Sequence, residues 1–284
     1  MKIIECPRDA MQGIKEFIPT ETKIEYLNKL LKVGFDTLDF GSFVSPKAIP
    51  QLADTAEVLE GIDLSLSNTE LLAICANKRG VEDLIKFEEI RYIGFPFSVS
   101  ETFQQRNTKK SIKESFDLVL EINELACKNN KDLVVYLSMA FGNPYGDQWH
   151  PDIVANWTEL LIEEGADVIS LSDTVGTSNK ENISQLFSTI IPTFPDIEIG
   201  AHFHTIPDNW EEKVKSAYES GCRRFDGALK GYGGCPMAKD ELVGNMATEN
   251  LLTFMDSNVI EHNLNLEYFE EAMDFANFIF NKYH

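Results

Sequence analysis

The sequence predicts an α/β fold, a (β/α)8 TIM barrel with extra C-terminal helices, and three observations predict it. Short β-branched or apolar segments alternate with longer amphipathic ones along the whole chain, as in a parallel sheet whose strands are joined by helices. Eight such short segments are present, and eight strand–helix units imply a closed barrel. The length of 284 residues suits one large barrel.

The eight predicted strands are the short runs of β-branched and apolar residues. The interval between consecutive runs leaves room for one helix after each strand. In chain order the strands are Lys2–Cys6, Thr37–Phe40, Leu71–Cys75, Tyr92–Phe97, Leu133–Met139, Asp167–Leu171, Ile197–His204 and Arg224–Ala228.

Helices are expected between consecutive strands, most clearly over Ser111–Lys128 and Pro151–Glu164. In both segments apolar residues recur three and four positions apart and the exposed positions are polar or charged, which is the period of a helix with one buried face. The tail from Asn245 to His284 is too long for one closing helix. Its segments LLTFM and EYFEEAMDFANFIF predict one or two extra helices outside the barrel.

A single domain is expected over residues 1–284. No linker rich in Pro, Gly or Ser and no shift in composition marks a second domain, and no internal repeat is evident beyond the strand–helix alternation. We expect the barrel core over residues 1–244, including a glycine-rich loop at 231–244. A C-terminal helical extension is expected over residues 245–284.

The charge balance excludes two classes of partner. The chain has 46 Asp and Glu against 25 Lys and Arg, a formal net charge of −21. Nucleic acids and anionic membranes are bound through clustered Lys and Arg, so neither is an expected partner. No segment approaches 18 uninterrupted apolar residues, and the charged start MKIIECPRDA does not resemble a signal peptide.

Cysteine usage predicts a reducing compartment, the cytoplasm. The five cysteines are an odd number, widely spaced, and form no CxxC pair, so neither a disulfide framework nor a structural zinc site is expected. Cys75 in LLAIC and Cys127 in ELACK are typical of small core residues.

The residues suited to chemistry fall at the ends of predicted strands, where a barrel places its active site. In AHFHT, His202 and His204 are two apart and therefore project to one side of the strand, while Phe203 faces the helices. Two imidazoles and a carboxylate such as Asp9 would suit a divalent cation. The alternative is a pair of hydrogen-bonded core histidines.

Arg8 and Asp9 follow the first strand, where their side chains can diverge, one toward a substrate oxyanion and one toward a metal. An arginine stays charged and presents a planar fork of donors, which suits a developing oxyanion. The alternative is an ion pair at the barrel end. Asp39 and Asp173 stand at the ends of the second and sixth strands.

The segment GYGGCPMAKDELVGN follows the eighth predicted strand and contains four glycines. Its backbone is permissive, so it is interpreted as a mobile lid over the active site. A cysteine in such a loop, Cys235, would be exposed and able to act as acid, base or nucleophile. The alternative is an incidental loop thiol.

Taken together, these segments resemble the 3-hydroxy-3-methylglutaryl-CoA lyase family, metal-dependent barrels related to isopropylmalate synthase. The match runs along nearly the whole chain, with the segments in the same order at compatible spacing. CPRDAMQ is similar to the family's PRDGLQ, LDFGSFVSPKAIPQ to its SFVSPKWVPQ region, SLSDTVGT to its SLGDTIGVGT, AHFHT to its HxHD, and GYGGCPMA with GNMATENLL to its GLGGCP and GNLATEDL.

The resemblance implies a metal site. Its ligands would be Asp9, His202, His204 and Asn245, the last reaching in from the segment after the lid. Mixed oxygen and imidazole ligands with open positions favour one Mg²⁺ or Mn²⁺ ion, and no organic cofactor is expected.

The resemblance also implies catalytic and substrate-binding residues. Arg8 corresponds to the family's catalytic arginine and Cys235 to its lid cysteine, while Asp39 and Asp173 would assist near the substrate hydroxyl. Three further residues in the matching segments are expected to bind the substrate. These are Gln12, Ser42 and Ser170.

The implied reaction is cleavage of 3-hydroxy-3-methylglutaryl-CoA to acetyl-CoA and acetoacetate. A base removes the proton of the tertiary hydroxyl, whose pKa the metal lowers, and the C–C bond breaks in a retro-Claisen sense. Arg8 would stabilise the acetyl-CoA enolate, and Cys235 would deliver the proton that completes acetyl-CoA. Asp173 and His202 are both candidates for the base.

Four positions depart from the family's segments. Ala10 replaces a glycine and loses its freedom at positive φ, so the loop after the first strand is expected to differ. Asp39 replaces a glutamate, Thr205 replaces an aspartate after the second histidine, and Phe141–Gly146 replaces the loop GCPYEG. A changed substrate wall is therefore expected, and a related 3-hydroxyacyl-CoA or a free hydroxy acid stays open as the substrate.

Other functions compete with the lyase. A Claisen-type synthase would condense acetyl-CoA with a 2-oxo acid, but such enzymes usually carry a C-terminal regulatory domain. An idle barrel serving as a binding protein would have no reason to keep both metal ligands and lid. The expected partners are an acyl-CoA and a second copy of the chain in a homodimer. Lys109 and Lys110 would contact the nucleotide phosphates of CoA or form a solvated surface pair.

Overall fold

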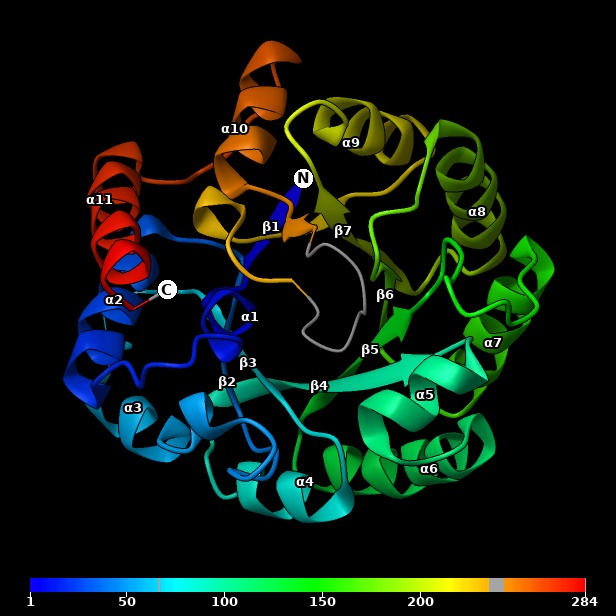
Figure 1. The fold of residues 1–284 in the computed structure, drawn as a ribbon, viewed down its shortest axis with the longest axis horizontal. Coiled ribbons are helices and arrows are strands. Elements are labelled where there is room, and N and C mark those ends of the chain that lie inside the picture. Colours follow the sequence, from blue (N-terminus) through cyan, green and yellow to red (C-terminus); the bar gives the residue numbers. More distant parts are fainter. Residues whose placement is uncertain (66, 235–242, 284) are drawn as a thin grey trace.

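The computed structural model describes residues 1–65, 67–234 and 243–283. At its centre eight parallel strands form a closed barrel, because β6 pairs with β7 as well as with β5 (Figure 1). In chain order these strands are β1 (Lys2–Glu5), β2 (Thr37–Ser42), β3 (Glu70–Ile74), β4 (Ile90–Ser98), β5 (Asp132–Ser138), β6 (Val168–Asp173), β7 (Glu198–Thr205) and β8 (Arg224–Gly227). The predicted fold class, a TIM barrel with C-terminal helices, is confirmed.

The strand ends differ from the predicted ones by one or two residues, and two of the differences concern the site. β6 runs on through Asp173, because Ser172 and Asp173 continue the ladder beside β7. Similarly, β2 runs on through Ser42 beside β3. None of these added residues is apolar and β-branched or aromatic, so the apolar pattern ended before the strand did at both places.

Helices surround the barrel, as Figure 1 shows. The predicted helix at Ser111–Lys128 begins one residue later, because Ser111 is its N-cap and forms a capping box with Glu114. None of the helices in the described ranges is long and apolar enough to cross a bilayer. The helices before the C-terminal tail are α1 (Pro7–Gln12), α2 (Thr20–Val33), α3 (Thr55–Gly61), α4 (Lys78–Leu84), α5 (Glu101–Thr108), α6 (Ile112–Lys128), α7 (Pro151–Glu163), α8 (Lys180–Thr193) and α9 (Trp210–Glu219), with short 3-10 turns at Pro50–Leu52 and Leu229–Gly231.

The C-terminal segment adds a short strand and two helices, β9 (Gly244–Asn245), α10 (Thr248–Ser257) and α11 (Leu266–Tyr283). α11, drawn red in Figure 1, lies against α2, and Phe280 meets the ring of Tyr26 edge-on at 6.4 Å. β9 pairs antiparallel with β7. The boundary expected between residues 244 and 245 therefore falls inside a strand that belongs to the rim of the barrel.

The apolar core has two parts. The larger part fills the space between strands and helices, and Phe203 lies there as predicted, 5.6 Å from the ring of Phe141. A smaller cluster forms from Leu72, Ile74, Val134, Tyr136 and Val168 on three of the strands. Because alternate strand residues point to opposite sides, this cluster fills the barrel interior.

Four cysteines lie among the described residues, and all four are free thiols. Cys6, Cys75 and Cys222 are buried. Cys127 is exposed on α6, so the prediction of a core residue is wrong there, because the helix turns this position toward solvent.

Candidate active site

A cavity of about 250 Å³ opens at the C-terminal ends of the strands. Five residues singled out from the sequence line it, and they come from α1 and β7. The lining also includes apolar side chains, among them Val44, Ile49, Ile74 and Phe103. The five lining residues from the sequence are Arg8, Asp9, Gln12, His202 and His204.

The segment after β1 is a short helix, α1. Pro7 occupies its first turn, where a missing N–H costs nothing, and Arg8 and Gln12 lie one helical turn apart. Ala10 lies inside this helix, and no residue of α1 has a positive φ. Ala10 therefore fits its position without backbone strain, because a helical backbone accepts alanine readily.

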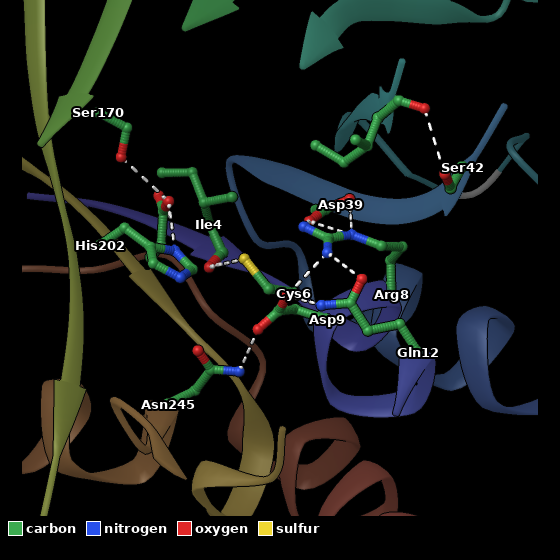
Figure 2. Close-up of polar contacts among 12 residues, drawn as sticks. Ile4, Cys6, Arg8, Asp9, Gln12, Asp39, Ser42, Ser170, His202 and Asn245 are labelled. Carbon is green, nitrogen blue, oxygen red and sulfur yellow. Dashed lines mark hydrogen bonds and ion pairs between the residues drawn. The ribbon is translucent and has the colours of Figure 1, made fainter. Parts of the chain in front are cut away.

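Arg8 joins three side chains. Its Nε lies 3.0 Å and its Nη2 2.6 Å from Oδ2 of Asp39, and its Nη1 donates to Asp9 Oδ1 at 2.7 Å and to Gln12 Oε1 at 3.0 Å. Figure 2 shows the guanidinium of Arg8 between Asp39 on one side and Gln12 on the other. The expectation that Arg8 and Asp9 diverge is wrong, because α1 holds both side chains on the cavity side, where they pair.

Burial makes this cluster electrostatically coupled. Burial alone would lower the pKa of Arg8, but the carboxylates of Asp39 and Asp9 raise it above its ordinary value. Burial raises the pKa of Asp39 to about 6, although the charge of Arg8 opposes the rise. The guanidinium therefore stays charged, and it presents a fixed cation to the cavity.

Asp9, His202 and His204 form a compact group. One ligand atom from each lies within 4.8 Å of the others. Burial lowers the pKa of His204 to about 4, and the charge of His202 adds to this effect. Burial would raise the pKa of Asp9, but Arg8 and the two histidines outweigh it and lower the pKa. A neutral imidazole beside an ionised carboxylate has the lone pairs that a divalent cation needs.

Asn245 completes this group through tertiary structure. β9 places it directly beside His204, and its Nδ2 donates to Asp9 Oδ2 at 2.7 Å and to the carbonyl of Tyr232 at 2.9 Å. Its Oδ1 is buried and has no hydrogen-bond partner, and Figure 2 shows this oxygen turned toward His202. A buried amide oxygen without a donor suits a cation ligand, so the residues fit a site for one divalent metal ion.

Asp173 and Asp39 stand one layer behind the cavity, whose lining includes neither. Asp173 accepts from Lys213 Nζ at 2.7 Å and from Ser178 Oγ at 2.5 Å, and all three side chains are buried. Lys213 also donates to the carbonyl of His204 at 2.9 Å. The Asp173 carboxylate is thus paired with Lys213. A base for the substrate hydroxyl would need to contact that hydroxyl instead.

Ser42 and Ser170 are not among the residues that line the cavity. Ser42 donates to the carbonyl of Ile74 at 3.3 Å, at the join between β2 and β3. Ser170 donates to Asp226 Oδ2 at 3.3 Å. Both hydroxyls are therefore engaged within the protein.

Part of the cavity wall comes from α5. Phe103, Asn107 and Thr108 line the cavity, whereas Phe141 is buried against Phe203. The Phe141–Gly146 segment, expected to be the altered substrate wall, is absent from the lining described here. It acts on the wall indirectly, because the next residue, Asp147, accepts hydrogen bonds from Ser100 and Thr102 at the start of α5.

The remaining residues from the sequence lie in separate parts of the chain. Cys235 lies outside the described residues. Thr205 is buried, and its Oγ1 donates to the carbonyl of Asn245 at 3.4 Å. Lys109 ends α5 as an exposed residue, and its Nζ donates to the carbonyl of Arg106.

Three functional candidates were not predicted from the sequence. Asp226 lies 3.1 Å from His202 Nδ1, Lys213 pairs with Asp173, and the buried hydroxyl of Tyr136 beside the cavity has no partner. Strand alternation in RFDG was a signal for Asp226, since it places Arg224 and Asp226 on one side. Lys213 carried no signal, because a lysine on an amphipathic helix is ordinarily solvated.

The model of the HMGL-like family matches residues 2–276 of this chain. The hydroxymethylglutaryl-CoA lyase YngG of Bacillus subtilis is 34% identical over 261 residues, which cover 92% of this chain and 86% of that protein. The mitochondrial hydroxymethylglutaryl-CoA lyase of Mus musculus is 31% identical over 278 residues, which cover 97% of this chain and 84% of that protein.

Solved structures agree with these similarities. The crystal structure of the Bacillus subtilis HMG-CoA lyase superposes with a TM-score of 0.90 at 32% identity, covering 97% of this chain and 92% of that one. An HMG-CoA lyase from Acinetobacter baumannii, in complex with coenzyme A and 3-methylmalate, gives a TM-score of 0.90 at 29% identity. That match covers 98% of this chain and 90% of the other.

Proposed function

The chain belongs to the HMGL-like family, and we propose that it is a divalent-metal-dependent carbon–carbon lyase that cleaves 3-hydroxy-3-methylglutaryl-CoA to acetyl-CoA and acetoacetate. Relatives that bear the name of this lyase are 31–34% identical over most of the chain, which supports the substrate.

One observation of the structure carries the proposal. Asp9, His202 and His204 meet beside the Arg8 guanidinium in one cavity at the C-terminal face of the barrel, and Asn245, whose amide oxygen is free, bonds Asp9 directly. A cation site next to a fixed positive charge suits a substrate that carries a hydroxyl, a carboxylate and a thioester carbonyl.

We propose one Mg²⁺ or Mn²⁺ ion as the cofactor, held by Asp9, His202, His204 and Asn245. When bound, such an ion supplies Lewis acidity toward the substrate's hydroxyl and carboxylate oxygens. The mixture of carboxylate, amide oxygen and imidazole supports this class of ion over a thiophilic one.

Arg8 is proposed to stabilise the negative charge that develops on the thioester oxygen as the C–C bond breaks. Asp39 and Asp9 already hold the guanidinium of Arg8 in place. Little reorganisation is therefore needed when negative charge develops on the thioester oxygen. Gln12 donates to Asp9 Oδ1 at 2.5 Å and accepts from Arg8, so it stands where it can also contact the substrate.

We assign Asp39 and Asp173 supporting roles. Asp39, which does not line the cavity, orients Arg8 by accepting hydrogen bonds from its Nε and Nη2. Asp173 holds Lys213, which in turn holds the backbone carbonyl of His204. The ion pair with Lys213 argues against Asp173 as the base for the substrate hydroxyl. Ser42 and Ser170, engaged elsewhere, are proposed to support the substrate site indirectly.

Cys235 is proposed as the acid that protonates the acetyl-CoA enolate, on the basis of the glycine-rich segment in which it stands. We further propose that the enzyme acts in the cytoplasm as a homodimer. The free thiols of Cys6, Cys75, Cys127 and Cys222 support a reducing compartment.

The test mixes the purified protein with 3-hydroxy-3-methylglutaryl-CoA and Mg²⁺, with and without EDTA, and follows acetyl-CoA and acetoacetate. The expected result is equimolar formation of both products, abolished by EDTA and restored by excess Mg²⁺. Absence of both products in the presence of bound metal would reject this substrate.

A further inference from the structure

His202 has an acidic neighbour on the side away from the cavity. Its Nδ1 lies 3.1 Å from Oδ2 of Asp226, which is 3% exposed. The register of β7 and β8 places the two residues directly opposite each other. The contact is therefore built into the barrel ladder and does not depend on a surface loop.

Two further side chains fix this pair. Ser170 donates to the same carboxylate oxygen at 3.3 Å, and Figure 2 shows Ser170 on the far side of His202 from Asn245. The ring of Tyr136 meets the His202 ring edge-on at 5.7 Å. The imidazole is thus held by a hydrogen bond at one edge and by packing against its ring.

The charged and titratable groups around Asp226 come from four strands. Arg224 lies two residues away on the same face of β8, Cys6 follows β1, Asp39 stands on β2, and Tyr136 projects from β5. The thiol of Cys6 donates to the carbonyl of Ile4. The hydroxyl of Tyr136 and Oδ1 of Asp226 have no partner. His202 is the imidazole in contact with Asp226 among the described residues.

We propose that Asp226 is a positioning residue that fixes the tautomer and orientation of His202 and thereby tightens the binding of the divalent cation. The inference rests on the proposed function. The carboxylate oxygen of Asp226 is an acceptor, so in the neutral imidazole that a cation requires, Nδ1 of His202 carries the hydrogen and Nε2 keeps its lone pair. Nε2 then faces Asp9 and His204, and metal-ligating histidines commonly donate their second N–H to a carboxylate in this way.

The same contact bears on the choice of base. In the proposed site, Nδ1–H of His202 is donated to Asp226 and Nε2 binds the divalent cation. His202 then has no lone pair for the substrate hydroxyl. Of the two base candidates from the sequence, Asp173 is paired with Lys213 and His202 is committed by Asp226. On this proposal neither residue serves as the base.

The first experiment reads the tautomer directly in the metal-free protein. Histidine labelled with ¹⁵N reports through its ring shifts and couplings which nitrogen is protonated. We expect the Nδ1–H form for His202 in the unaltered protein and a shift toward the Nε2–H form in Asp226→Leu, which keeps the volume but loses the acceptor. An unchanged His202 tautomer in Asp226→Leu would overturn the inference.

The second experiment measures Mn²⁺ affinity by electron paramagnetic resonance of the free ion. Asp226→Leu is expected to bind Mn²⁺ about 10–100-fold more weakly. Asp226→Asn, whose amide oxygen can still accept from Nδ1, should fall between it and the unaltered protein. Val134→Ala is the matched control, because it disturbs the apolar cluster of the barrel interior without removing a partner of Asp226 or His202, and its affinity should change little.

Several outcomes decide between this inference and the function on which it rests. Equal Mn²⁺ affinity in the unaltered protein and both Asp226 variants would overturn the positioning role alone. A loss in Val134→Ala as large as in Asp226→Leu would also overturn it, since any damage to the barrel interior would then act alike. Failure of the unaltered protein to bind Mn²⁺ would reject the proposed metal site as well.

Discussion

Arg8 and Asp39 meet through two nitrogens of the guanidinium, with Nε 3.0 Å and Nη2 2.6 Å from the same carboxylate oxygen. The carboxylate comes from β2 and the arginine from α1, so neighbouring units of the barrel fix the cation that faces the cavity. Both side chains are buried. The orientation of Arg8 is therefore a property of the barrel rather than of the short helix that carries it.

Asp39→Ala should lower kcat by about 100-fold, because a guanidinium released on one side no longer matches the developing charge. Steady-state kinetics with 3-hydroxy-3-methylglutaryl-CoA measures this, with KM expected to change less than kcat. Asp132→Ala removes the carboxylate partner of an exposed arginine, Arg91, and serves as the control with near-normal kcat. An Asp39→Ala enzyme as active as this control would contradict the role given to Asp39.

Asn245→Ala should weaken the binding of Mn²⁺ or Mg²⁺, because it removes the buried amide oxygen that has no partner within the protein. Dialysis against EDTA should inactivate the unaltered enzyme, and added Mn²⁺ should restore it at lower concentration than in the variant. Asn258→Ala, which removes an amide that bonds its own helix, is the control. Equal metal requirements in the two variants would exclude Asn245 as a ligand.

Cys235→Ala should fold and bind metal but lose most turnover, by about 10²–10⁴-fold, the usual contribution of a positioned acid. Cys127→Ala removes an exposed thiol on α6 and should leave turnover unchanged. Rates of acetyl-CoA formation by both variants at saturating metal test this. Near-normal turnover by Cys235→Ala would remove this thiol from the mechanism.

Lys213→Met should destabilise the protein by about 3–5 kcal/mol, because it leaves the Asp173 carboxylate buried without its cation. Urea unfolding followed by circular dichroism measures the free energy of unfolding. Adding Asp173→Asn to this variant should recover part of the loss, since no unpaired charge then stays buried. A double variant no more stable than Lys213→Met would argue against the ion pair as the cause.

The pH dependence of stability should carry a contribution from Glu5. Burial raises the pKa of Glu5 to about 8 from an ordinary value of 4.5, so between these values the folded protein holds a proton that the unfolded chain has released. Unfolding then releases a proton, and the free energy of unfolding falls by about 1.4 kcal/mol per pH unit as pH rises through this window.

Glu5→Gln should remove this contribution and leave the protein more stable than the unaltered one at pH 9. The amide can still accept from the N–H of Leu229 and donate to the hydroxyl of Thr248, the two groups that contact Glu5. Urea unfolding at pH 6 and pH 9 provides the comparison. The same drop in stability between these pH values in both proteins would show that Glu5 is not responsible.

The sequence by itself determined the fold class and the set of chemical groups. Alternating apolar and amphipathic segments gave eight strands in the right places, because strand and helix periods are local properties of the chain. The two-residue spacing of His202 and His204 placed both on one side of β7, where both line the cavity. Arg8, Asp9 and Gln12 reach the same cavity from the segment after β1.

Tertiary structure alone decided which groups meet. Asp173, Ser42 and Ser170 come at or near strand ends, yet they bond Lys213, Ile74 and Asp226 and do not line the cavity. The sequence contained no sign that a helical lysine would be 1% exposed. Side-chain direction at a strand end depends on where the ladder stops, and this is set by the neighbouring strand.

The amide oxygen of Asn245 and the carboxylate of Asp226 show most clearly what the sequence left open and the tertiary structure decided. Asn245 stands beside His204 because an antiparallel strand of two residues pairs with β7, and Asp226 faces His202 because of the register between β7 and β8. Such pairings join residues far apart in the chain through backbone hydrogen bonds. Composition and periodicity therefore identify the groups, but the closed barrel decides which atoms form the site.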